Sequence, residues 1–149
     1  MLFAAASAAG HCSTDAPPVW PPRFTLVQRR IPDNLTLGNA TTVTYYDWER
    51  GANLIVITPD ADPSAVLWDL ELNDRHSFYF YPNSRACTPM SFPVGILRPD
   101  WLSNATALGA STRNGRRVFG WTKADFIDYY ADADTCEPAS QLVGSAVAA

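Results

Sequence analysis

The sequence has 149 residues, 47% of them hydrophobic and 17% charged, with a formal net charge of −4. This length fits one domain, and the composition is typical of a globular protein and excludes a disordered chain. The 11 basic residues form no continuous stripe, which argues against nucleic acid or an anionic membrane surface as a partner. No stretch is apolar over 18 consecutive residues, so no transmembrane segment is predicted.

The first ten residues form a short run of apolar and small side chains. The run contains Ala6-Ser7-Ala8, which fits the A-x-A cleavage pattern of a signal peptide, so residues 1–10 are interpreted as a signal peptide or its remnant. The competing interpretation is an alanine-rich tail. The first interpretation predicts a protein that is secreted or lies in the lumen of the secretory pathway.

Three Asn-X-Thr sequons support the same compartment, because they are acceptors for N-glycosylation. They begin at Asn34, Asn39 and Asn104. Cys12, Cys87 and Cys136 match no zinc or redox spacing, which favours a structural disulfide. We expect Cys87–Cys136 because both residues lie inside the folded region, while Cys12–Cys87 and Cys12–Cys136 remain open.

Residues 11–22 form a proline-rich segment that leads into the fold. From there the sequence alternates with period two, which predicts short strands rather than helices. Turn-forming residues separate the strands, a spacing typical of an antiparallel meander. The predicted strands cover 24–29, 43–48, 53–58, 65–73 and 76–81.

Residues 82–98 are expected to be irregular because prolines interrupt them. Further on, 118–122 and 126–130 are predicted as two short strands, or as a strand and one helical turn. A single β domain is therefore expected over 23–138, followed by a flexible tail at 139–149. The dipeptide Asn114-Gly115 favours a tight hairpin turn, so the three arginines around it are interpreted as solvated.

The alternation assigns the side chains of two predicted strands to opposite faces of the sheet. Trp68 and Leu70 fall on one face of their strand, with Asp69 and Glu71 on the other. In the strand 76–81, phenylalanines occupy one face and tyrosines the other, so both faces carry aromatic side chains. Such a sheet must cover its second face with another sheet, a partner or a ligand.

Asp60 and Asp62 are the clearest candidates for a metal site, because they follow an apolar strand as Asp-x-Asp. Many glycosyltransferases hold a divalent cation against a nucleotide-sugar with this arrangement, since hard cations bind oxygen ligands. The competing interpretation is an acidic turn. Only two histidines are present, and no Gly-x-Ser-x-Gly motif presents a serine, so neither a multi-histidine metal site nor a hydrolase triad is expected.

The stretch Phe92-Pro93-Val94-Gly95-Ile96-Leu97-Arg98-Pro99-Asp100-Trp101-Leu102 is distinctive. Together with Tyr46-Asp47-Trp48 and Trp121-Thr122-Lys123, it resembles a family of short secreted plant and algal proteins without assigned function. More distantly, a cysteine followed by Phe-Pro-x-Gly-Ile, then Leu-Gly, then Trp is similar to ependymin-related secreted glycoproteins. This second resemblance implies a mainly β fold with a curved antiparallel half-barrel, like that of bacterial lipoprotein carriers, and an apolar pocket in its concave face. The chain departs from the pattern of the plant and algal family after Pro138, so the sheet is expected to be incomplete at its C-terminal end.

The distinctive stretch is itself expected to be scaffold. Trp101 contributes apolar mass, and Gly95 is expected where a side chain would block a close approach. Arg98 is held extended by the following proline and can reach a carboxylate such as Asp100 or Asp125. The alternative is that Arg98 receives an anionic ligand head group.

These observations favour a secreted, non-catalytic domain that binds a lipid or another apolar or amphipathic small molecule, without a cofactor. The candidate ligand-binding residues are Phe78, Phe80, Trp68, Trp101 and Arg98. The competing hypotheses are a divalent-dependent, glycosyltransferase-like enzyme that uses Asp60 and Asp62, and a cell-surface interaction protein without a small ligand.

Overall fold

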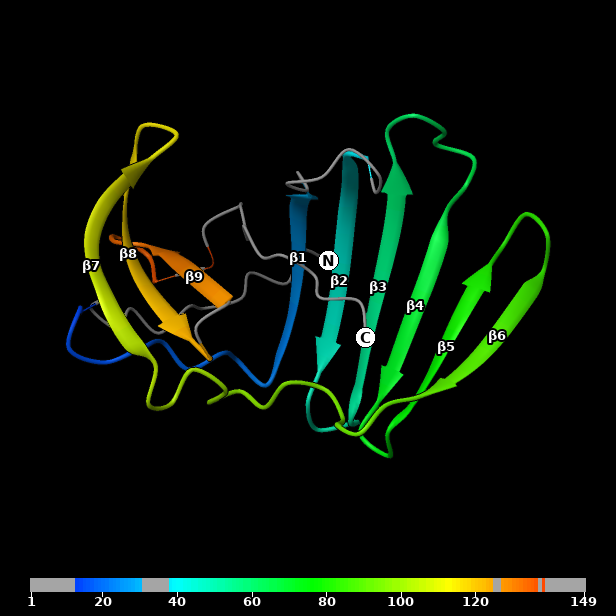
Figure 1. Ribbon diagram of the computed structural model, residues 1–149, viewed down its shortest axis with the longest axis horizontal. Helices are drawn as coiled ribbons and strands as arrows, with labels where there is room; N and C mark the ends of the chain where they lie inside the picture. The colour runs from blue at the N-terminus through cyan, green and yellow to red at the C-terminus, as the bar shows by residue number, and fades with distance from the viewer. Residues whose placement is uncertain (1–12, 31–37, 125–126, 137, 139–149) are drawn as a thin grey trace, which may run out of the picture.

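The computed structural model describes residues 13–30, 38–124, 127–136 and 138, which form nine strands in two antiparallel sheets (Figure 1). The larger sheet is a six-stranded meander in which each strand pairs with the next along the chain. The second sheet has three strands, also in chain order. The strands of the larger sheet are β1 (Arg23–Arg30), β2 (Ala40–Asp47), β3 (Ala52–Pro59), β4 (Leu67–Leu72), β5 (His76–Tyr81) and β6 (Ala86–Ser91). Those of the smaller sheet are β7 (Thr106–Arg113), β8 (Arg116–Lys123) and β9 (Ile127–Asp132).

The prediction of a mainly β, antiparallel fold is confirmed, and the strands are divided between two sheets instead of one. The five strands predicted up to residue 81 correspond to β1–β5. The alternative of a strand and one helical turn after residue 118 is wrong, because β8 and β9 are paired strands. The larger sheet is open, with β1 and β6 as its edges.

Two strands were not predicted. Residues 86–91 were expected to be irregular, but they form β6 even though Pro89 lies inside it. A proline is tolerated there because β6 is an edge strand, which pairs on one side only. The other strand, β7, has mostly small side chains and a register shift between Ala107 and Gly109, where Gly109 has φ +84°.

The predicted hairpin turn at Asn114-Gly115 is confirmed. These two residues join β7 to β8 with φ values of 49° and 75°. Two successive residues with positive φ are typical of a type I′ turn, whose twist matches that of the flanking strands. The arginines on either side stay near the surface, where Arg113 stacks on the ring of Tyr130 and Arg116 lies 3.8 Å from an Asp132 carboxylate oxygen.

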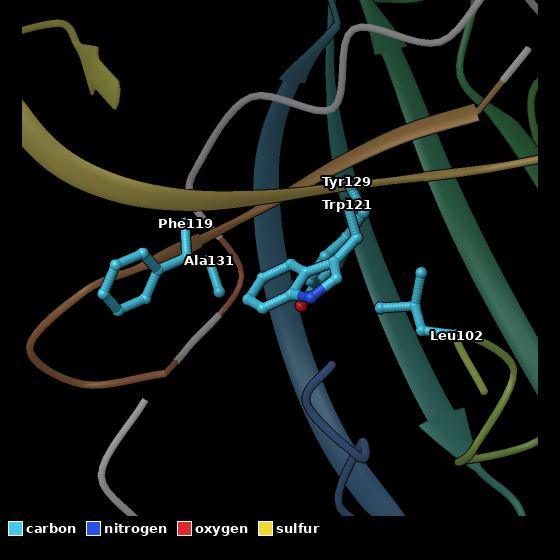
Figure 2. Close-up of a cluster of buried hydrophobic side chains, with 5 residues drawn as sticks. All are labelled: Leu102, Phe119, Trp121, Tyr129 and Ala131. Atoms are coloured by element: carbon cyan, nitrogen blue, oxygen red, sulfur yellow. The ribbon is translucent and has the colours of Figure 1, made fainter. Parts of the chain in front are cut away.

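The hydrophobic core lies against the smaller sheet (Figure 2). Trp121 and Leu102 have no exposed surface, and Tyr129 is almost fully buried. Gly120 makes room for the neighbouring strand, because a Cβ there would lie 2.7 Å from the Tyr130 ring. The core cluster consists of Leu102, Phe119, Trp121, Tyr129 and Ala131, with Trp20, Trp101, Ala105 and Ala133 packed against it.

Trp20 joins the two sheets. Its ring lies edge-on to Phe24 of β1 and Tyr46 of β2, with centroid distances of 5.2 and 5.6 Å. It also contacts Trp101 at 5.4 Å and Tyr129 of β9 at 6.4 Å, and its indole N–H donates to the Tyr129 hydroxyl at 3.3 Å. One side chain therefore connects the larger sheet to the core of the smaller one.

The segment between β6 and β7, residues 92–105, passes along one end of the larger sheet (Figure 1), and we call it the scaffold segment. The amide of Phe92 donates to the Arg75 carbonyl at 3.0 Å, and the Tyr46 hydroxyl donates to the Leu97 carbonyl at 2.7 Å. The close approach predicted at Gly95 is confirmed, because a Cβ there would lie 3.0 Å from the backbone of Asn73. These contacts are those expected of a scaffold.

Replacing Trp20 with alanine should lower the free energy of unfolding by about 2–3 kcal/mol, less than a fully buried aromatic side chain would cost because Trp20 is only partly buried. Urea denaturation followed by circular dichroism measures the change. The neighbouring Val19 is 67% exposed, so Val19→Ala is the matched control and should change stability by less than about 0.5 kcal/mol. Equal stabilities for the two variants would show that Trp20 does not hold the sheets together.

Candidate ligand-binding face

On one face of the larger sheet, two central rows of side chains are almost entirely apolar across the six strands. Residues directly opposite each other on antiparallel strands share a face, so the register identifies its members. We call this side of the sheet the apolar face. One row across it contains Val27, Val43, Val56, Trp68, Phe80 and Cys87, and the next contains Thr25, Tyr45, Leu54, Leu70, Phe78 and Pro89.

The apolar face is open in the part of the chain that the structure describes. Val27 is 60% exposed, Tyr45 49% and Trp68 42%, although large apolar side chains usually lie in the interior. Trp68 packs edge-on against Phe80 at a centroid distance of 5.9 Å. The aromatic side chains of β4 and β5 therefore form a continuous surface.

Burial is concentrated on the opposite side of the sheet, which we call the second face. Among the side chains of the six strands whose burial the structure describes, all the buried ones lie there. They are Ala40, Thr42, Tyr46, Asp69 and Ser77. The protein thus covers its more polar face and leaves the more apolar one open, which is the reverse of the usual arrangement of a one-sided sheet.

A shallow depression of about 420 Å³ lies on the apolar face, over β1–β4. Tyr45, Leu54 and Leu70 contribute apolar surface to it, and Arg23 and Asp47 lie at its edge. Arg23 Nε lies 3.2 Å from Asp47 Oδ1. Its full lining is Arg23, Phe24, Thr25, Tyr45, Tyr46, Asp47, Arg50, Ala52, Leu54 and Leu70.

Charges at this edge are paired with each other. Burial acts to raise the pKa of Asp47, but hydrogen bonds from the Arg50 backbone and the Arg23 side chain hold it below its usual value. Arg23 also pairs with Glu49, and Arg50 Nε lies 3.5 Å from Asp47 Oδ2. The depression therefore combines an apolar surface with a charged edge, which suits an amphipathic molecule.

The structure divides the predicted ligand-binding residues into two groups. Trp68, Phe78 and Phe80 lie together on the apolar face, as their alternation predicted. Trp101 instead packs on the core against Trp20, and Arg98 is exposed and pairs with Asp100 at 3.1 Å. Trp101 and Arg98 are therefore not part of this surface, and their contacts are those of the scaffold segment.

The sequence did not single out the members of the apolar face on β1–β3, such as Val43, Val56 and Leu54. Each strand showed its own alternation, but which alternating set joins that of the next strand depends on the register. The one available signal was the nearly all-apolar run from residue 54 to 57. Apolar residues on both sides of a strand indicate that both faces of the sheet have something to contact.

Asp60 and Asp62 both interact with protein groups. Asp60 receives a two-point contact from the Arg29 guanidinium, with Nη1 at 2.7 Å from Oδ1. Asp62 accepts hydrogen bonds from the Ser64 hydroxyl at 2.6 Å and the Ser64 amide at 3.0 Å, which lower its pKa. Nowhere in the described ranges do three or more His, Cys, Asp or Glu side chains gather where they could hold a metal ion. These contacts are those of a capped turn.

The second face carries a polar cluster on three adjacent strands. Asp69 of β4 is only 9% exposed, and its pKa is raised to about 6 by burial and by the neighbouring charge of Glu71. Asn53 of β3 lies opposite Glu71 and donates to its Oε2 at 2.8 Å. Tyr79 of β5 lies opposite Asp69, and its pKa is raised by burial and by the carboxylates of Asp69 and Glu71.

The predicted Cys87–Cys136 disulfide is not formed, because Cys87 is a free, exposed thiol. Its strand β6 pairs with β5, which places Cys87 opposite Phe80 on the apolar face. Cys12 lies outside the described residues. Of the pairings that the sequence left open, only Cys12–Cys136 is compatible with a free Cys87.

Two of the three predicted sequons fall on described residues, and both have exposed asparagines. Asn39 precedes β2, and Asn104 lies in the turn before β7 with φ 63°. Asn34 lies outside the described residues, as does the whole segment interpreted as a signal peptide. In the described part of the chain, no helix has the length and apolar character needed to cross a membrane.

Comparison with known proteins identifies a family. A family model described as a domain of unknown function, DUF8395, matches residues 19–147. No curated protein matches the chain. The matched region contains both sheets and the scaffold segment between them.

The raised pKa of Asp69 predicts a specific pH dependence of stability. Well below pH 3.8, the ordinary pKa of an aspartate, both states hold the proton, but between about pH 4 and pH 6 the unfolded chain has released it and the folded protein keeps it. The free energy of unfolding should therefore fall as pH rises through this range, by about 2–3 kcal/mol, and then level off.

Denaturation in metal-free buffer at pH 4 to pH 7.5 measures this effect as the difference between the wild type and Asp69→Asn. The variant cannot ionise, so it should be the more stable protein above pH 6. The difference removes the contribution of carboxyls with lowered pKa, such as Asp47 and Asp62, which act in the opposite direction. A difference that does not vary with pH would contradict the prediction.

Proposed function

Because the chain belongs to the DUF8395 family of domains of unknown function, we propose its function from its geometry: it binds an apolar or amphipathic small molecule, such as a lipid, on the apolar face. The observation that supports this most strongly is the distribution of burial between the two faces. The rows of valine, leucine and aromatic side chains stay open while the more polar side is covered. An exposed apolar surface that extends across six strands is typical of a binding site.

The depression gives the ligand a defined place. Its apolar part can take a hydrocarbon chain, since burying apolar surface contributes about 25 cal/mol per Å². The charged edge, where Arg23 and Asp47 pair, can exchange hydrogen bonds with a polar head group. We infer that the ligand lies along the sheet with its polar end near these residues and its apolar end toward Trp68.

The resemblance to ependymin-related proteins points the same way, because in that family a cupped antiparallel sheet surrounds an apolar pocket. The six-stranded meander found here is the element that would play this part. We therefore propose that the larger sheet is this chain's equivalent of the half-barrel and that its apolar face is the concave one.

Two alternatives have less support. The transferase hypothesis depended on Asp60 and Asp62, and both carboxylates are occupied by Arg29, Ser64 or backbone amides. An interaction protein without a small ligand would use the same apolar face for another macromolecule. That protein would neither bind an apolar dye nor retain a lipid, so the experiment below separates it from a lipid carrier.

We expect an apolar fluorescent dye to bind the purified protein and to be displaced by fatty acids or phospholipids. Trp68→Ser should weaken dye binding about tenfold, because losing an apolar contact of this size costs about 1.5 kcal/mol or more. Native mass spectrometry of the protein, purified without detergent, should show a retained small molecule.

The matched control is Val94→Ser. Val94 is 70% exposed but lies in the scaffold segment, so this variant removes exposed apolar surface without changing the apolar face. Equal dye affinities for Trp68→Ser and the wild type would overturn the proposed site. A protein that binds neither dye nor lipid but forms a stable dimer would favour the interaction protein.

We also propose that the protein is secreted, as the N-terminal run and the sequons predict. Peptide mapping of exported protein under non-reducing conditions should find glycans at Asn34, Asn39 and Asn104, a free Cys87, and a Cys12–Cys136 disulfide. Closing so long a loop can contribute up to about 5 kcal/mol in the loop-entropy model. Unmodified asparagines together with three free thiols would contradict the proposal.

A further inference from the structure

The polar cluster on the second face contains two buried oxygen atoms that have no hydrogen-bond partner in the described structure. One is Oδ1 of Asp69, a side chain only 9% exposed, and the other is Oδ1 of Asn53. A buried polar atom without a partner costs about 1–3 kcal/mol, so such atoms are rare in native proteins. Both are acceptors, and a negative charge lies beside them on Glu71. The missing partner is therefore a donor or a cation.

The register places the three side chains next to one another on the second face. Asn53 lies directly opposite Glu71, and Asp69 is two residues from Glu71 on the same face of β4. Diagonal neighbours across an antiparallel pair are about 7–8 Å apart, and alternate residues on one strand are separated by a similar distance. Side chains that lean toward a common centre from these positions can bring their oxygens within the 2.3–2.6 Å that calcium requires.

The Asn53 amide has one atom paired and one atom free. Its Nδ2 donates to Glu71 at 2.8 Å, so the nitrogen is fixed on the carboxylate and Oδ1 is left without a partner. Carboxylate and amide oxygens are the ligands of hard cations, whereas nitrogen and sulfur ligands favour softer metals. We propose that Asn53, Asp69 and Glu71 form a binding site for a hard divalent cation of the calcium class, with water completing the coordination.

This site is separate from the one proposed for the apolar ligand. Asp69 and Glu71 alternate along β4 with Trp68 and Leu70, so the cation and the ligand lie on opposite sides of one strand. The site is also distinct from the metal site predicted at Asp60 and Asp62, whose carboxylates pair with Arg29 and cap a turn. Failure of either proposal leaves the other intact.

Terbium is a suitable probe, because it replaces calcium and emits when a nearby aromatic ring is excited. Tyr79 lies opposite Asp69 on the same face, so it can transfer energy to a bound ion. We expect sensitised Tb³⁺ emission that calcium displaces. Calcium at 100 times its Kd should also raise the Tm by about 5–10 °C relative to chelator.

Asp69→Asn and Glu71→Gln keep the shape of each side chain but remove its charge, so each should weaken cation binding at least tenfold. The Tm of each variant is measured in chelator beside that of the wild type, so that lost binding is not attributed to unfolding. Asp60→Asn is the matched control and should bind terbium as the wild type does. Both second-face variants should keep wild-type affinity for the apolar dye.

The proposal is overturned if the wild-type protein shows neither sensitised emission nor a calcium-dependent Tm at millimolar concentrations. It is equally overturned if Asp69→Asn and Glu71→Gln retain wild-type affinity. Loss of binding in Asp60→Asn alone would place the cation at the loop between β3 and β4 instead.

Discussion

The contact between Trp20 and its aromatic neighbours is the interaction on which the arrangement of the two sheets depends. The core is concentrated on β8, β9 and Leu102, and the six-stranded sheet has no comparable cluster of fully buried apolar side chains in the described residues. Trp20 reaches Phe24 and Tyr46 of the larger sheet from that core. Because aromatic pairs in edge-on geometry add about 0.5–1.5 kcal/mol each beyond burial, one residue can hold two sheets in a fixed relation.

This arrangement explains how the larger sheet can leave its apolar face open. Trp20 packs on Phe24 and Tyr46 of the second face. The scaffold segment supports one end of the sheet, where Tyr46 bonds to Leu97 and Gly95 packs on Asn73. The opposite face is not needed to hold the fold together. The apolar face can therefore carry Val27, Tyr45 and Trp68 at the surface, and a bound apolar molecule would offset the cost of exposing them.

Much of the fold could be predicted from the sequence, because alternation is a local property. The strands up to residue 81 and the turn at Asn114-Gly115 were predicted from a few neighbouring residues each. β6 was missed because Pro89 argues against a strand unless the strand is known to be at an edge, and edge position is a property of the whole sheet. The Cys87–Cys136 pairing was wrong for a similar reason: pairing depends on which residues approach in space, and Cys87 lies on an exposed edge strand.

The candidate sites also depend partly on local alternation and partly on how distant segments come together. Alternation alone placed Trp68 and Asp69 on opposite faces of one strand, and the structure confirms it. It could not show which face the protein covers, nor that Asn53 would lie opposite Glu71, because both depend on register and on distant segments. Trp101 was interpreted as a candidate ligand contact because an aromatic residue in a core and one in a pocket have the same sequence signal, and the structure packs it on the core.

Asp69 and Glu71 finally show where this chain departs from the most stable arrangement available to it. A buried carboxyl whose pKa rises to about 6 destabilises the folded protein whenever it is ionised at neutral pH. An amide of the same shape would avoid that cost. Destabilising features of this kind are common at functional sites, because a bound ligand can provide the missing charge or hydrogen bonds. A cation on the second face would neutralise the two carboxylates, satisfy the unpaired oxygens and stiffen β3 and β4. These strands also carry Leu54, Trp68 and Leu70 on the other side, so the two proposed sites lie on opposite faces of the same pair of strands.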